Sequence, residues 1–161
     1  MMAIALPFLL LYTTLSLFLS FCDARRGQLP DRFTCPLLWG GFLFHLCIIP
    51  TQLADAVWGA IAGYGSFAFI YWSYRLVRGR EGLGYGDVKF LAALGAWHGW
   101  MSLPFLVCWA ALLACSGIAA LGIVYGKSAL KNPLPFGPFL AAAGFITGCY
   151  RFTSEAINWS L

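Results

Sequence analysis

Charged side chains are scarce in this chain. Only 10% of its 161 residues are Asp, Glu, Lys or Arg, whereas 61% are hydrophobic, and the mean hydropathy is +0.79. A soluble domain carries about a quarter charged residues, so this composition excludes a soluble globular protein and predicts a polytopic membrane protein of one domain, residues 1–161. The lipid bilayer is therefore an expected partner. The net charge of +4 is too small to indicate a nucleic-acid partner, and none is expected.

Several features of metal-binding and exported proteins are also missing. The six cysteines form no C-x-x-C pair, so they favour neither a zinc site nor a disulfide framework and are interpreted as small packing residues. His45 and His98 have no His, Cys or acid three or four residues away, which favours packing over a metal site. No metal or cofactor is expected. Residues 1–22 lack a basic start and an A-x-A cleavage site, which predicts a retained helix, not a signal peptide.

Apolar runs of helix length are abundant. Spanning the hydrocarbon layer takes roughly 20 apolar residues in a helix, and six runs come near this length, although the fourth and sixth are short for a complete crossing. The sequence therefore predicts an all-α fold with about six transmembrane helices. The runs are residues 3–22, 33–50, 54–74, 86–98, 102–125 and 136–150.

The basic residues lie on alternate links between these runs. Nine of the ten Lys and Arg residues fall on the links at 23–32, 75–89 and 126–135, and the links around 51–53 and 98–103 contain none. Basic loops stay on the cytoplasmic side of a membrane. We therefore expect these three links to be cytoplasmic and, with six crossings, both termini to face the other side.

Two acids stand at predicted helix ends on this basic side. Asp23 ends the first apolar run and Asp87 begins the fourth. Two carboxyl groups within a few ångströms cannot both ionise readily, so such a pair can share a proton and hydrolyse an amide without a metal. Which member acts as the base is not defined for a coupled pair, and its activity should have a bell-shaped pH dependence.

Each acid also has a simpler structural interpretation. Asp87 follows a glycine and would be an ordinary N-cap, a role that Asp31 would fill for the second helix. Asp23 could anchor the first helix at the interface by pairing with Arg25 or Arg26, although an acid is costly there when desolvated. On composition alone, the N-cap interpretation of Asp87 is favoured over catalysis.

Two segments resemble the signatures of the type IV prepilin peptidases. DARRGQLPD, at 23–31, is similar to the first signature of that family, and EGLGYGDVK, at 81–89, is similar to its G-x-G-D signature. Residues 55–64 and 135–139 also resemble family segments. The likeness runs from about position 6 to position 150, and the two signatures occur in order on links of the same predicted side.

The resemblance implies an aspartic endopeptidase of the bacterial inner membrane. Members of the family cut the basic leader from type IV prepilins or pseudopilins at the cytoplasmic face. Their two catalytic aspartates correspond to Asp23 and Asp87, and Asp31 corresponds to a supporting acid. Members that also methylate their product carry an N-terminal region with paired cysteines, so methyltransferase activity is not expected here.

Four residues near Asp87 are candidates for substrate binding. Gly84 and Gly86 would let an extended peptide approach closely, or would simply form a loop turn. Tyr85 could hydrogen-bond a carboxyl group or pack, and Lys89 could keep Asp87 ionised or extend to the interface. Two other functions stay open, an inactive peptidase-like assembly protein and, less favoured, a small proton-coupled transporter.

Overall fold

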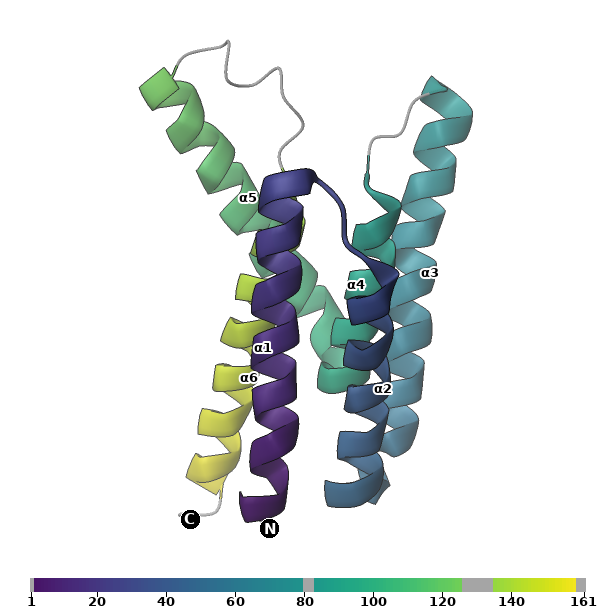
Figure 1. Ribbon diagram of the computed structural model, residues 1–161, viewed down its shortest axis with the longest axis vertical. Coiled ribbons are helices and arrows are strands. Elements are labelled where there is room, and N and C mark those ends of the chain that lie inside the picture. The colour runs from purple at the N-terminus through teal and green to yellow at the C-terminus, as the bar shows by residue number, and fades with distance from the viewer. Residues whose placement is uncertain (1, 80–82, 126–134, 159–161) are drawn as a thin grey trace.

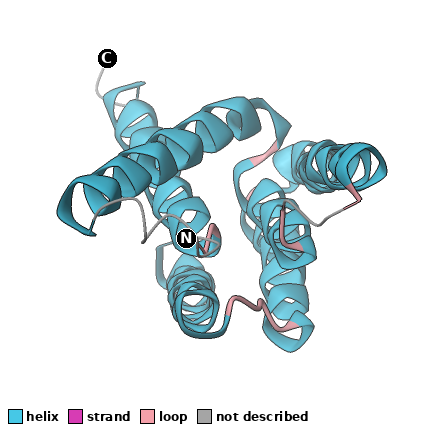
Figure 2. Ribbon diagram, turned by 90° about the horizontal axis from the view of Figure 1, so that it is seen from above, coloured by secondary structure: helices cyan, strands magenta, loops and turns pink. Residues whose placement is uncertain are grey.

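The computed structural model describes residues 2–79, 83–125 and 135–158, which form six α-helices and no strand (Figures 1 and 2). The predicted all-α fold is confirmed. Short 3₁₀ turns at Pro50–Gln52 and Trp100–Ser102 precede the third and fifth helices. The helices are α1 (Met2–Arg26), α2 (Asp31–Ile48), α3 (Leu53–Arg78), α4 (Tyr85–His98), α5 (Leu103–Tyr125) and α6 (Gly137–Asn158).

Three of these helices are long and apolar enough to cross a membrane. They are the stretches Ile4–Arg26, Pro50–Arg78 and Trp100–Ile123, which correspond to α1, α3 and α5. α1 and α3 each run about one turn past the apolar runs that predicted them. Their last turns carry arginines, whose positive charge is favourable at a helix C-terminus. The crossing of the membrane by all six helices stays a prediction.

α4 lies at the centre of the bundle. It packs against α3, α2 and α6, and 11 of its 14 residues are buried. A helix that is apolar on nearly all sides is suited to such a covered position. Gly59 of α3 and Gly95 of α4 face each other so closely that a side chain on either would overlap the backbone of the other. Small residues allow this close approach of membrane helices.

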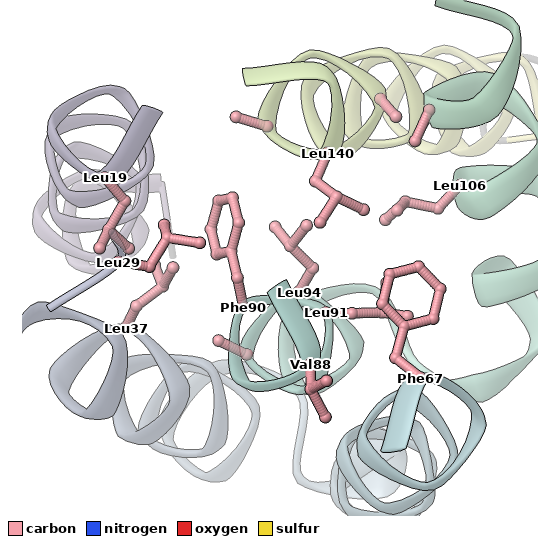
Figure 3. Close-up of a cluster of buried hydrophobic side chains, with 14 of the residues drawn as sticks. Leu19, Leu29, Leu37, Phe67, Val88, Phe90, Leu91, Leu94, Leu106 and Leu140 are labelled. Atoms are coloured by element: carbon pink, nitrogen blue, oxygen red, sulfur yellow. The ribbon is translucent and has the colours of Figure 1, made fainter. Parts of the chain in front are cut away.

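Large apolar side chains of α4 connect it to the helices on both sides (Figure 3). Phe90 is fully buried and points toward Leu19 of α1 and Leu37 of α2, whereas Leu94 points toward Leu140 of α6. Farther along α4, the indole nitrogen of Trp97 donates a hydrogen bond of 2.7 Å to the carbonyl oxygen of Leu37. α4 is thus held between α2 and α6, the two helices that pack against α1.

Candidate active site

Asp23 lies in the last turn of α1 and is only 5% exposed. The helix ends three residues later, at Arg26, because Gly27 adopts a left-handed conformation, with φ of 59°, and donates its N–H to the carbonyl oxygen of Asp23 at 2.8 Å. The side chain accepts a hydrogen bond of 2.8 Å at Oδ2 from the backbone N–H of Gly137, the first residue of α6. Asp23 is thus held between the end of one helix and the start of another.

Asp87 is the third residue of α4 and is 6% exposed. Its Oδ1 is buried and has no hydrogen-bond partner among the residues that the structure describes. It lies outside the three candidate membrane spans, and burial raises its pKa to about 7, with the nearby charge of Asp23 as the second cause and a backbone hydrogen bond from Gly84 as a smaller, opposing one. A carboxyl group in this state carries a proton for much of the time at neutral pH.

The two acids therefore share one end of the bundle. Figure 1 shows the last turn of α1 and the first turn of α4 in the same half of the molecule, and Asp87 is close enough to Asp23 for the charge of Asp23 to raise its pKa. Two buried carboxyl groups in this relation can hold one proton between them. One can then act as a base while the other donates a proton.

The simpler interpretations of these acids are wrong in three respects. The N-cap of α4 is Gly84, so Asp87, two positions into the helix beyond Tyr85, is not the N-cap residue. α2 begins at Asp31 itself, and this carboxylate pairs instead with Lys89 of α4 at 2.7 Å. Asp23 binds the N–H of Gly137, a partner different from the arginines expected for an interfacial anchor.

The glycines before Asp87 have two distinct roles. A β-carbon on Gly86 would lie 2.8 Å from Cβ of Leu29, so this glycine lets the link after α1 pack against the start of α4. Its position is explained by packing without a bound peptide. A β-carbon on Gly84 would lie 3.1 Å from Oδ2 of Asp87. Gly84 thus keeps the space beside the carboxyl group open.

Tyr85 and Lys89 belong to a polar cluster on the surface beside Asp87. The hydroxyl groups of Tyr85 and Tyr64 form a hydrogen bond, and the ammonium of Lys89 lies 5.3 Å from the centre of the Tyr85 ring. Lys89 is paired with Asp31, whose side chain is 61% exposed. The salt bridge that the structure gives Lys89 is therefore to this exposed acid, and the expectation that Lys89 keeps Asp87 ionised has no contact to support it.

The two histidines lie at the other end of the bundle. Nδ1 of His45 donates to the carbonyl oxygen of Gly41 at 2.9 Å, and Nε2 of His98 lies 3.1 Å from the hydroxyl oxygen of Tyr12. Both line an apolar cavity of about 610 Å³ bordered by α1, α2, α4 and α6. Within the described ranges no cluster of three or more His, Cys, Asp or Glu side chains could hold a metal ion.

Gly137 is the site residue that the sequence did not single out. A β-carbon there would lie 2.7 Å from Oδ2 of Asp23 and 3.1 Å from its Cγ, so the start of α6 fits against this carboxyl group only as glycine. The signal in the sequence was the family-like segment 135–139, which carried no assigned role because sequence separation hides its contact with α1.

An all-α membrane protein with two buried, interacting carboxyl groups has the parts of an aspartic hydrolase. The sequence profile of the type IV leader peptidase family matches residues 10–120, a range that includes both Asp23 and Asp87. The chain belongs to the type IV leader peptidase family.

Its curated relatives agree with this assignment. The chain is 67% identical to Leader peptidase HopD of Salmonella typhimurium over 147 residues, which is 91% of this chain and 95% of that protein. It is 64% identical to Leader peptidase HopD of Escherichia coli, over 89% and 92% of the two chains. Prepilin leader peptidase/N-methyltransferase of Aeromonas salmonicida is 46% identical over 85% of this chain, which spans 47% of that longer protein. No solved structure matches the chain.

Proposed function

We propose that this leader peptidase cleaves the basic leader of type IV prepilins or pseudopilins at the cytoplasmic face of the bacterial inner membrane, with Asp23 and Asp87 as its catalytic pair. Residues 1–161 act as one peptidase domain. The observation that carries the proposal is the pair itself, two buried acids from different helices, one of which has a carboxyl oxygen without a partner in the described part of the chain.

The chemistry follows from the shared proton. An ionised carboxylate takes a proton from water while the protonated partner polarises the carbonyl group of the scissile peptide bond. Burial strengthens both interactions because the local dielectric constant is low. The pair needs no nucleophilic side chain, and water supplies the oxygen that attacks the substrate.

The cytoplasmic placement is supported by the distribution of charge. Arg25 and Arg26 end α1, and Arg75 and Arg78 end α3, at the same end of the bundle as the two acids. Basic residues flanking membrane helices favour the cytoplasmic side. Arg80, Lys127 and Lys131, which also carried this prediction, lie outside the described residues.

The approach to Asp87 has features suited to an extended peptide. Gly84 leaves the space beside the carboxyl group open, and Tyr85 and Lys89 border it on the surface. A basic leader would be repelled by the arginines of this end unless acids offset them. The exposed carboxylate of Asp31 can provide such a charge if a leader side chain replaces Lys89 as its partner. Glu81, another acid that the sequence offers for such a counter-charge, lies outside the described residues.

The two alternative functions differ in what they require of the acids. A proton-coupled transporter needs an ionisable group along its path, but Asp23, Asp31, Asp55 and Asp87 all lie in first or last helical turns. An inactive assembly protein would keep its phenotype when both Asp23 and Asp87 are replaced.

The experiment is complementation. The chain is expressed in a bacterial strain without its own leader peptidase, together with a prepilin, and removal of the leader is followed by gel mobility. We expect mature pilin with the parent chain and none with the Asp23→Asn/Asp87→Asn double variant. Processing by the double variant would exclude the catalytic pair, and no processing by a well-expressed parent chain would favour the assembly protein.

A further inference from the structure

The start of α6 makes the environments of the two acids unequal. Oδ2 of Asp23 accepts the N–H of Gly137, whereas Oδ1 of Asp87 has no partner in the described ranges. We propose that Gly137 is a positioning residue that keeps Asp23 as the ionised base and thereby leaves the shared proton on Asp87. This inference rests on the proposed function, because it assigns roles within the Asp23–Asp87 pair.

The bond from Gly137 favours the charged form of Asp23. The first N–H groups of a helix have no partner within the helix and carry a partial positive charge. A carboxylate that accepts such a group forms a charge-assisted hydrogen bond, which is stronger than a bond between neutral groups. Because Pro138 has no N–H, the donor at the second position of α6 is missing and Gly137 makes the contact.

The surroundings of Asp87 favour its neutral form. The carboxyl group is buried with Oδ1 unpartnered in the described ranges, and this burial outweighs the opposing backbone hydrogen bond from Gly84. An ionised oxygen without a hydrogen bond is costly in such a place, whereas a protonated carboxyl group is tolerated. Of the two acids, Asp87 is therefore the one that holds the proton.

These roles give a balanced reaction. Asp23 removes a proton from water as the water oxygen bonds to the carbonyl carbon, and Asp87 gives its proton to the carbonyl oxygen. The first step leaves a tetrahedral diol at the former carbonyl carbon. In the second step the C–N bond breaks, the nitrogen takes the proton from Asp23, and Asp87 recovers a proton from one hydroxyl group of this diol. One water is consumed, the new carboxyl and amino ends form, and the pair returns to its starting state.

The requirement for glycine at this position is one of space. Gly137 does not have the positive φ seen at Gly27, Gly79 and Gly99, so other residues could adopt its backbone conformation. A side chain is excluded because its first carbon would lie 2.7 Å from Oδ2 of Asp23. Alanine would thus move the carboxylate away from its donor without removing any atom of the catalytic pair.

The test compares Gly137→Ala with Gly144→Ala. Gly144 lies on the same helix in an equally tight place, where a β-carbon would be 2.6 Å from the hydroxyl oxygen of Tyr12 and 3.1 Å from Cδ2 of Leu94, but it does not contact Asp23. The purified full chain cleaves a prepilin peptide in detergent, and kcat, KM and their pH dependence are measured. Asp23→Asn and Asp87→Asn are measured alongside.

For Gly137→Ala we expect a tenfold to hundredfold lower kcat at nearly unchanged KM. The acid limb of the pH profile should move up by about one pH unit, the effect of losing one hydrogen bond to a charged group. The position of this limb does not depend on the amount of folded enzyme. Gly144→Ala should lose stability but keep the parent profile. An unmoved limb in Gly137→Ala, or an equal shift in both variants, would overturn the inference.

Two further measurements keep the outcomes distinct. If Asp23→Asn or Asp87→Asn retains activity, the proposed function fails, whereas inactive Asp variants with an unmoved limb in Gly137→Ala reject only the role of Gly137.

If Gly137→Ala does not fold, Phe136→Ala takes its place. It loosens the start of α6 from Phe67 without adding atoms beside Asp23. Its acid limb must also move to higher pH, and an unmoved limb rejects the inference.

Discussion

The two ends of this bundle both contain buried ionisable side chains, but they differ in how those side chains are paired. At one end His45 is bonded to the carbonyl oxygen of Gly41 and His98 to the hydroxyl of Tyr12. At the other end Asp23 has a single backbone donor, and Oδ1 of Asp87 has no partner in the part of the chain that is described. The four ionisable side chains are buried to a similar extent, but only the acidic end contains a buried oxygen without a hydrogen-bond partner among the described residues.

This difference fits a structural role for the histidines and, under the proposed function, a chemical role for the two acids. Buried polar groups in folded proteins are almost always hydrogen-bonded, because an unmade bond costs stability. A paired histidine contributes to packing and needs no other role. A buried carboxyl oxygen without a hydrogen bond destabilises the fold, and such costs are typical of functional sites. The large cavity lies beside the histidines and not beside the two acids.

The largest expected effect comes from replacing the two acids, compared with replacing the two histidines at the other end. Asp23→Asn and Asp87→Asn should each lower kcat/KM for leader cleavage by about a thousandfold or more, within the range of general acid–base catalysis. His45→Asn and His98→Gln keep a polar group near the bonded ring nitrogen and should stay within a few-fold of the parent. Quantitative cleavage of a prepilin peptide measures all four. A folded histidine variant without activity would remove the distinction between the two ends.

A smaller effect concerns stability and its pH dependence. Asp87 has a pKa of about 7 in the folded state against an ordinary value of 3.8, so between these pH values the unfolded state ionises and the folded state does not. Buried Asp87 therefore lowers the free energy of unfolding only slightly below pH 4 and by its full amount above pH 7. Asp87→Asn removes this cost, and its gain in the free energy of unfolding should grow by about 2–4 kcal/mol from pH 4 to pH 8.

Thermal unfolding in detergent across this pH range measures the gain. Asp31→Asn is the control, because Asp31 is exposed and its pair with Lys89 contributes little to stability. Its difference from the parent should stay small at every pH. A gain for Asp87→Asn that is flat with pH would show that Asp87 is ionised in the folded protein over the whole range.

The sequence predicted the helices well because hydrophobic length and charge are local properties. The run at 86–98 anticipated α4, which spans Tyr85–His98, to within one residue. Its central, covered position was not predictable, because it depends on contacts such as Gly59 with Gly95 that join residues distant in the sequence.

The candidate site was predicted only in part, because some of its features are local in the sequence and others depend on contacts between distant residues. Asp23 and Asp87 were visible as acids at the ends of apolar runs, and the capping role considered for Asp87 fails only because α4 begins at Tyr85. The roles of Gly86 and Gly137 depend on Leu29 and Asp23, their spatial neighbours. A glycine in a sequence can reflect a need for conformational freedom or for close packing, and only its neighbours in the structure show which of the two applies.

The smallest expected effect tests whether the open space beside Asp87 matters. In Gly84→Ala the new carbon would lie 3.1 Å from Oδ2 of Asp87, so the carboxyl group must move by a few tenths of an ångström, and kcat should fall roughly threefold to tenfold. Gly84 is also the N-cap of α4, and alanine is a poor N-cap. Gly84→Ser separates the two effects, because serine adds the same carbon but caps well. Equal losses in both variants assign the effect to the contact with Asp87, whereas full activity in Gly84→Ser would assign it to the helix start. Gly65→Ala on α3, where an added carbon meets nothing within 4 Å, should leave kcat unchanged.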